Sequence, residues 1–80
     1  MKFVIKVRLK KGILDPQGKT VNQALHHLGY EQIRDVRIGK LIEVEIDESD
    51  PRKARQILEE ASQKLLANPV IEDFEIQPEE

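Results

Sequence analysis

Two Asp-Pro pairs, Asp15-Pro16 and Asp50-Pro51, constrain the fold of this chain more than any other feature. An aspartate side chain accepts hydrogen bonds from the free amides at the start of a helix, and proline is favoured at the first helical position. Each pair therefore predicts a helix start. Each also follows a stretch in which apolar and charged residues alternate, which is typical of a strand. With a third alternating stretch at the end, the predicted order is strand, helix, strand, helix, strand.

The spacing of apolar residues indicates which face of each predicted element is buried. In "KFVIKVRLK" the apolar residues share one parity and the basic residues share the other, which predicts a strand with one face on a core. The first helix has an apolar stripe before a C-cap at Gly29, made of Val21, Ala24, Leu25 and Leu28. The second helix has a similar stripe and ends at Asn68-Pro69; its stripe is Ala54, Ile57, Leu58, Ala61 and Leu65.

The middle extended segment, "QIRDVRIGKLIEVEI", keeps one apolar parity across Gly39. The residues of that parity are Val36, Ile38, Ile42, Val44 and Ile46. We therefore predict one long strand that is bent or bulged at Gly39, with a hairpin of two short strands as the alternative. The last strand is predicted in "VIEDFEI", with Val70, Phe74 and Ile76 facing the core.

These elements predict an α+β fold: a two-layer βαβαβ sandwich with a long bent middle strand and both helices on one face of the sheet. The alternative is a βαββαβ ferredoxin-like arrangement. A chain of 80 residues makes one domain, residues 1–80. The opposite face of the sheet mixes apolar residues with charges that are basic on the first strand and acidic on the third. Such a face is either a contact with another protein chain or a solvated surface.

Length and composition limit the possible functions. A chain this short buries only about 60% of its unfolded surface, and it has no cysteine for disulfides or thiolate metal sites. Oligomerisation is a common remedy at this size. The net charge of −2 gives no electrostatic case for nucleic acid. The predicted sheet has no exposed aromatic platform for RNA, since Phe3 and Phe74 have the core parity. With no apolar leader or membrane span in the sequence, we expect a cytoplasmic protein.

The stretch "GILDPQGKT" has the glycine, lysine and threonine of a phosphate-binding loop, but not its spacing. That loop needs four residues between its two glycines, and here five separate Gly12 from Gly18. Pro16 removes an amide donor, and Asp15 places a negative charge where phosphate would lie. The stretch is better explained as a helix start, with Gly18 on the side of the helix where a neighbour can approach closely.

The other candidates for chemistry are weaker. His26 and His27 are adjacent, so on a helix they point about 100° apart, whereas a helical zinc pair needs residues i and i+4. The many carboxylates follow strand alternation and helix exteriors, whereas a general acid needs a desolvated pocket. The residues alone thus predict a small α+β domain with a surface for partners, without catalytic or metal-binding residues.

Four stretches in this order, "LDPQGKTV", "ALHHLGY", "DVRIGK" and "KLLANPVIEDFEI", closely resemble the PurS family, the small subunit of phosphoribosylformylglycinamidine synthase. The resemblance implies a noncatalytic subunit of a glutamine-dependent, ATP-consuming C–N ligase of de novo purine (IMP) biosynthesis. That enzyme converts formylglycinamide ribonucleotide to the formylglycinamidine ribonucleotide. The small subunit is implied to assemble the synthetase and glutaminase subunits and to support ammonia transfer between them. It is implied to form a homodimer or homotetramer and to hold no cofactor, because ATP and Mg²⁺ are used by the large synthetase subunit.

Two sets of residues carry the motifs and are our predicted partner interface. The first is the helix start, Asp15, Pro16, Gln17 and Gly18, for which a structural cap is an equal alternative. The second is Arg37, Gly39 and Lys40, where the middle strand bends and basic side chains would meet acidic groups or carbonyls of a partner; solvated strand residues are an equal alternative. The alternative function is a small regulatory ligand-binding domain of ferredoxin-like shape.

Overall fold

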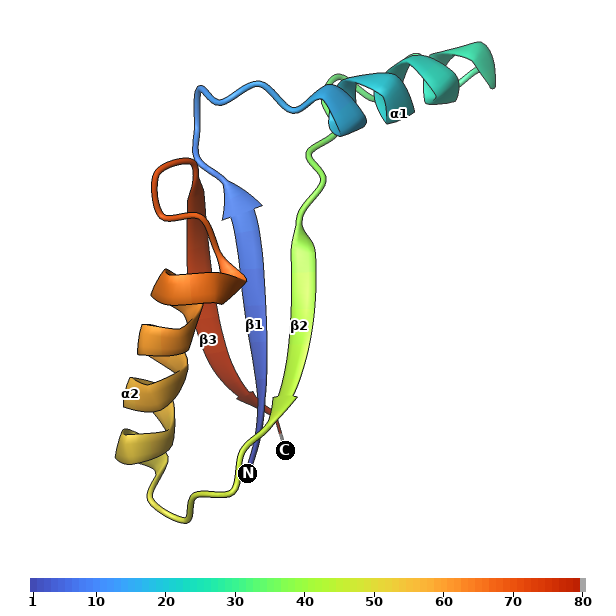
Figure 1. The fold of residues 1–80 in the computed structure, drawn as a ribbon. Helices are drawn as coiled ribbons and strands as arrows, with labels where there is room; N and C mark the ends of the chain where they lie inside the picture. The colour runs from blue at the N-terminus through green and yellow to red at the C-terminus, as the bar shows by residue number, and fades with distance from the viewer. Residues whose placement is uncertain (80) are drawn as a thin grey trace.

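The computed structural model describes residues 1–79, which form a three-stranded antiparallel sheet with the strand order β2-β1-β3 (Figure 1). The strands are β1 (Lys2–Leu9), β2 (Lys40–Glu45) and β3 (Glu72–Glu79). In the register, Ile5 of β1 pairs with Ile42 on one side and Ile76 on the other. The predicted α+β class and the order βαβαβ are therefore confirmed.

One helix covers one face of this sheet. Helix α2 (Pro51–Ala61) begins as predicted, with Asp50 accepting a hydrogen bond from the Arg52 amide at 3.0 Å, and continues as a π-helical turn, η1 (Ser62–Leu66). The core lies between this helix and the sheet and consists of Phe3, Ile5, Val7, Ala54, Leu58, Ala67 and Ile76. The predicted inner parity of β1 is thus confirmed. The prediction for Val70 was wrong, because this residue lies in the turn before β3 and is exposed.

Helix α1 (Pro16–His27) does not lie on the sheet, so the prediction that both helices cover one face was wrong (Figure 1). The chain leaves β1 at Leu9, turns at Gly12, and places α1 beyond the end of the strands. None of the core residues comes from α1. An apolar stripe indicates that a helix buries one face but not what covers it. We call residues 10–39, which contain α1 and the return segment 30–39, the arm.

The long middle strand is shorter than predicted within this chain. Strand β2 begins at Lys40, and residues 33–39 are not part of a strand ladder. The physical reason is where β1 ends: Lys40 is opposite Val7 and β1 stops at Leu9, so residues before Ile38 run past the end of their only neighbouring strand. The alternative hairpin at Gly39 is not formed either. Gly39 lies close to β1, because a Cβ atom there would lie 2.5 Å from the carbonyl oxygen of Val7.

Candidate functional site

The base of the arm is held together by the side chain of Asp15, which is only 6% exposed. Its Oδ1 atom accepts a hydrogen bond from the Gly18 amide at 2.9 Å, as an N-cap does, and its Oδ2 atom accepts one from the Ile38 amide at 2.6 Å. These two bonds, with the positive charge of Arg37, hold the pKa of the Asp15 carboxyl below its ordinary value. One carboxylate therefore caps α1 and fixes the return segment to it.

The same side of α1 contacts the main chain of the return segment along its length. Gly18 lies against the carbonyl group of Val36 so closely that a Cβ atom would overlap its oxygen. One turn later, Asn22 donates from Nδ2 to the carbonyl oxygen of Arg34 at 3.4 Å. Another turn later, Nε2 of His26 lies 2.6 Å from the carbonyl oxygen of Ile33, and since a carbonyl only accepts, the Nε2 atom donates. The arm is thus a helix and an extended segment joined by polar contacts.

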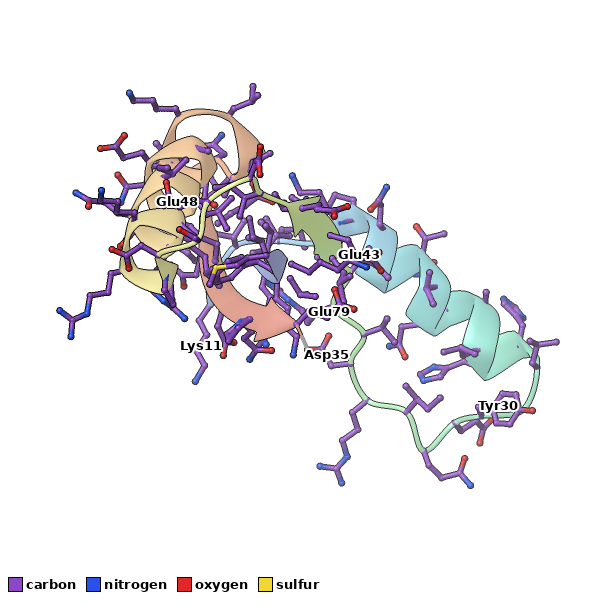
Figure 2. The ribbon with its side chains drawn as sticks, turned by 90° about the horizontal axis from the view of Figure 1, so that it is seen from below. Lys11, Tyr30, Asp35, Glu43, Glu48 and Glu79 are labelled. Atoms are coloured by element: carbon purple, nitrogen blue, oxygen red, sulfur yellow. The ribbon has the colours of Figure 1, made fainter. Side chains whose placement is uncertain are left out.

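The apolar residues of the arm are left exposed. Leu14 is 71% exposed, Leu28 is 73% exposed and Tyr30 is 54% exposed. Figure 2 shows Tyr30 at the far end of the arm, away from the sheet. A shallow pocket of about 520 Å³ lies on this surface, lined by Pro16, Gln17, Thr20, Val21 and Ile38. An apolar surface of this extent on a small protein is typical of a contact with another chain.

A second hollow, of about 660 Å³, lies where the arm joins the sheet. Its walls are the end of β1, the turn that follows it, and the segment 35–41, which includes most of the "DVRIGK" motif. Five cationic side chains and one carboxylate line it: Lys6, Arg8, Lys11, Arg37, Lys40 and Asp35. We call this hollow the basic cleft.

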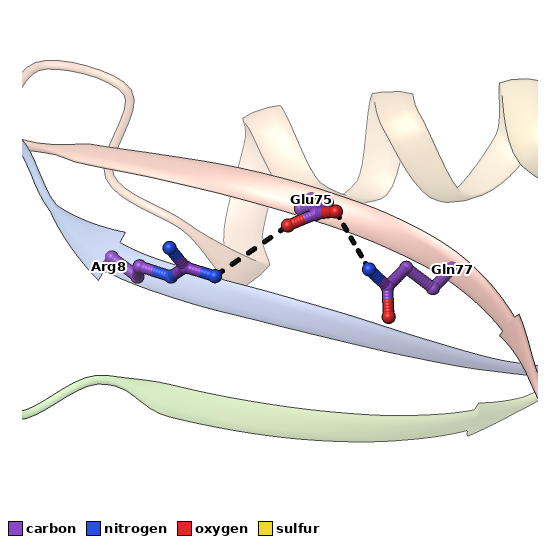
Figure 3. Close-up of polar contacts among 3 residues, drawn as sticks. All are labelled: Arg8, Glu75 and Gln77. Carbon is purple, nitrogen blue, oxygen red and sulfur yellow. Dashed lines mark hydrogen bonds and ion pairs between the residues drawn. The ribbon is translucent and has the colours of Figure 1, made fainter.

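Most cations of the basic cleft have contacts within the chain. Arg37 donates from Nη2 to the carbonyl oxygen of Lys10 at 3.2 Å, and Lys40 donates from Nζ to that of Leu66 at 3.1 Å. Arg8 lies 3.7 Å from Oε2 of Glu75, whose other oxygen accepts a hydrogen bond from Gln77 (Figure 3). The bond of Arg37 closes the base of the arm between its first residue and the return segment, and the bond of Lys40 links the start of β2 to η1. Arg37 and Lys40 thus contact carbonyl groups of their own chain. Their contact with a partner stays a prediction.

The structure brings the two predicted sets of site residues together. Asp15 and Gly18 contact the main chain of residues 36–38, while Pro16 and Gln17 line the apolar pocket beside Ile38. Gly39 and its neighbours line the basic cleft on the other side of the same segment. Sequence reasoning missed Asn22 and His26 as contacts. Their spacing from Gly18, four and eight residues along the helix, was the available signal.

His26 and His27 show no sign of a metal site. Nε2 of His26 contacts a carbonyl group, and among residues 1–79 no three His, Cys, Asp or Glu side chains are grouped as metal ligands. Over the same residues, no helix is long and apolar enough to cross a membrane.

Comparison with known proteins identifies the family. Residues 2–80 match the sequence model of PurS, described as phosphoribosylformylglycinamidine (FGAM) synthase. The chain belongs to the PurS family. It is 47% identical over 79 residues to the PurS subunit of Bacillus subtilis, covering 99% of this chain and 93% of that one. It is 40% identical over 78 residues to the PurS subunit of Methanocaldococcus jannaschii, with 98% and 94% covered.

Solved PurS structures have the same fold. The B. subtilis PurS structure superposes with a TM-score of 0.89 at 47% identity, covering 99% of this chain and 98% of that one. A chain in the structure of PurLQS from Thermotoga maritima superposes with a TM-score of 0.86 at 33% identity, covering 95% and 93%. The projecting arm is therefore part of a PurS fold.

Proposed function

We propose that this chain is the noncatalytic small subunit of phosphoribosylformylglycinamidine synthase, in the cytoplasm. It holds the synthetase and glutaminase subunits together and supports the transfer of ammonia from glutamine to formylglycinamide ribonucleotide. The observation that carries the proposal is the similarity of almost the whole chain, at 33% identity, to a chain of the T. maritima PurLQS structure. The match of residues 2–80 to the FGAM synthase subunit family supports it.

The polar side chains of the arm support a structural rather than a chemical role for it. Asp15, Asn22 and His26 bind main-chain groups of the return segment. Arg37 binds the main-chain carbonyl of the first residue of the arm, and Lys40, which follows the arm, binds one in η1. Side chains used in this way hold a surface in one shape. A projecting, partly apolar arm with many internal polar contacts suits a subunit that bridges other chains.

Self-association through the arm is part of this proposal. Strand β2 is an edge of the sheet, and residues 33–39 form no strand ladder within the chain. Exposed edges of this kind pair with strands of other chains. The segment 33–39 of a second copy, placed beside β2, would give a four-stranded sheet, which is the ferredoxin-like arrangement built from two chains. The exposed apolar residues of α1 would then be covered in a homodimer, from which a homotetramer can be built.

The test is glutamine-dependent formation of the amidine by the purified synthetase and glutaminase subunits, with and without this chain. We expect glutamine-dependent activity only when the chain is present, whereas ammonia-dependent activity needs it less. The variant Leu28→Asp should reduce the restored activity, because it places a charge on the apolar surface of the arm. Its control is Gln56→Asp, at an exposed position of α2 far from the arm.

Two negative results together would contradict the assembly role. If the chain changes neither rate and does not co-elute with the two subunits during turnover, the assembly role is wrong. The chain would then be better described as a ligand-binding regulatory domain.

A further inference from the structure

The basic cleft is lined mostly by positively charged side chains, whereas the chain as a whole is negatively charged. Five of its lining side chains are cationic and only Asp35 is acidic, although the whole chain has a net charge of −2. Clustering of one sign in a hollow concentrates the electrostatic potential and attracts ions of the other sign. The cleft is therefore a locally basic site on an acidic protein, and Asp73 and Glu75 lie beside Lys6, Arg8 and Lys11 only in the adjacent hollow.

Two of these cations have no partner within the part of the chain that the structure describes. The side-chain ammonium groups of Lys6 and Lys11 make no hydrogen bond or ion pair in residues 1–79, whereas the side chains of Arg37 and Lys40 are held in place by carbonyl oxygens. The carbonyl contacts of Arg37 and Lys40 do not neutralise their charges. The cleft thus combines two positioned cations with two uncommitted ones.

The remaining walls are apolar or open. Leu9 and Leu41 line the cleft, and its volume of about 660 Å³ lies within the range of small-molecule sites. Gly12 has a φ of +85° with no atom within 4 Å of a Cβ position, so this side of the cleft is unobstructed. A ligand with a charged group and an apolar or aromatic part fits these walls better than a bare ion.

We propose that the basic cleft binds a small phosphate-bearing molecule, with the phosphate between Lys6, Lys11 and Arg37 and the organic part against Leu9 and Leu41. Phosphate suits lysine as a point charge and arginine as a planar donor. Of the stretch "GILDPQGKT" at residues 12–20, which lacks the spacing of a phosphate-binding loop, only Gly12 lines this cleft. The proposal goes beyond the assembly role and does not depend on it.

The test is titration of the full-length chain with AMP, ATP, inorganic pyrophosphate and adenosine, followed by calorimetry and by amide chemical shifts. We expect saturable binding of AMP and ATP, with shifts at Lys6, Gly12 and Gly39, and weakening as salt is added. Pyrophosphate measures the contribution of phosphate alone. Adenosine, which lacks phosphate, should bind at least tenfold more weakly than AMP.

Variants assign the binding to the cleft. Lys6→Ala and Lys11→Ala should each weaken AMP binding roughly fivefold, the scale of one partly solvated charge contact. The control Lys53→Ala removes an exposed lysine of α2 outside the cleft and should have no effect. The proposal is overturned if no phosphate compound saturates the protein, if adenosine binds as well as AMP, or if Lys53→Ala weakens binding equally. None of these results would alter the outcome of the glutamine-dependent assay.

Discussion

Replacement of Gly18 by alanine should destabilise the protein, although helix propensity predicts the opposite. Gly18 is the third residue of α1, and a glycine inside an exposed helix costs about 1 kcal/mol relative to alanine. Here a Cβ atom would overlap the carbonyl oxygen of Val36 and lie 2.9 Å from Oδ2 of Asp15. Neither group can move away without breaking the hydrogen bond between Asp15 and Ile38, which is 2.6 Å long.

The size of the effect follows from these two opposing terms. Overpacking a fixed site costs about 1–3 kcal/mol, and the gain in propensity offsets about 1 kcal/mol of that. We therefore expect a net loss of up to about 2 kcal/mol in the free energy of unfolding. For a protein of this size the urea midpoint would fall by up to about 2 M. The Ile38 amide should also exchange faster with solvent, because its acceptor is displaced.

The matched control is Gly29→Ala, which also adds a methyl group at the end of α1. Gly29 has a φ of +99° but no atom within 4 Å of a Cβ position, so only the backbone angle opposes the change, at about 1 kcal/mol. Exchange of the Ile38 amide should be unchanged in this variant. If Gly18→Ala instead raises the urea midpoint, or leaves Ile38 protected, the close approach of α1 to the return segment is wrong.

Three further predictions follow from the same contacts. The folded-state pKa of Asp15 is lowered, so its stabilisation is fully present above the ordinary value of about 3.9 and is lost as the pH falls through the lower value. Asp15→Asn should flatten the pH dependence of the urea midpoint between about pH 2 and 5, and an equally steep profile would contradict this. Gly39→Ala should cost about 1–3 kcal/mol, because its Cβ atom would lie 2.5 Å from Val7 O; an unchanged midpoint would refute the close pairing. Ser62→Ala should be neutral or stabilise by up to about 1 kcal/mol, because the fully buried hydroxyl has no hydrogen-bond partner among the described residues; a larger loss would reveal one.

The sequence predicted those parts of the fold that depend on neighbouring residues. Asp15 and Asp50 cap the two helices as expected, since capping needs only a side chain and the amides that follow it. The inner face of β1 was also predicted, because alternation determines which side chains share a face. Both are local properties, and local patterns report them directly.

The position of α1 depends on distant contacts, and the sequence does not specify it. The apolar stripe of α1 predicted burial, but the helix is held by polar contacts of Asn22 and His26 with main-chain carbonyls. Every residue has a main-chain carbonyl that can accept a hydrogen bond. The sequence of the return segment therefore does not indicate which of its carbonyls Asn22 and His26 contact. The sequence motifs singled out the residues where α1 meets the return segment. Lys6 and Lys11 belong to no such motif, so no pattern in the sequence selected them.

The middle strand predicted from the sequence is longer than β2, and this difference points to pairing with another chain. Val36 and Ile38 continue the apolar parity of Ile42 and Val44, yet only the latter pair lies in a strand of this chain. Alternation of apolar and polar residues matches a strand that is paired with a neighbour and has one face covered. Within a single copy, residues 33–39 have no strand partner. The pattern and the structure are both satisfied if residues 33–39 pair with a strand of another copy, which also explains why the apolar side of the arm is exposed in a single copy.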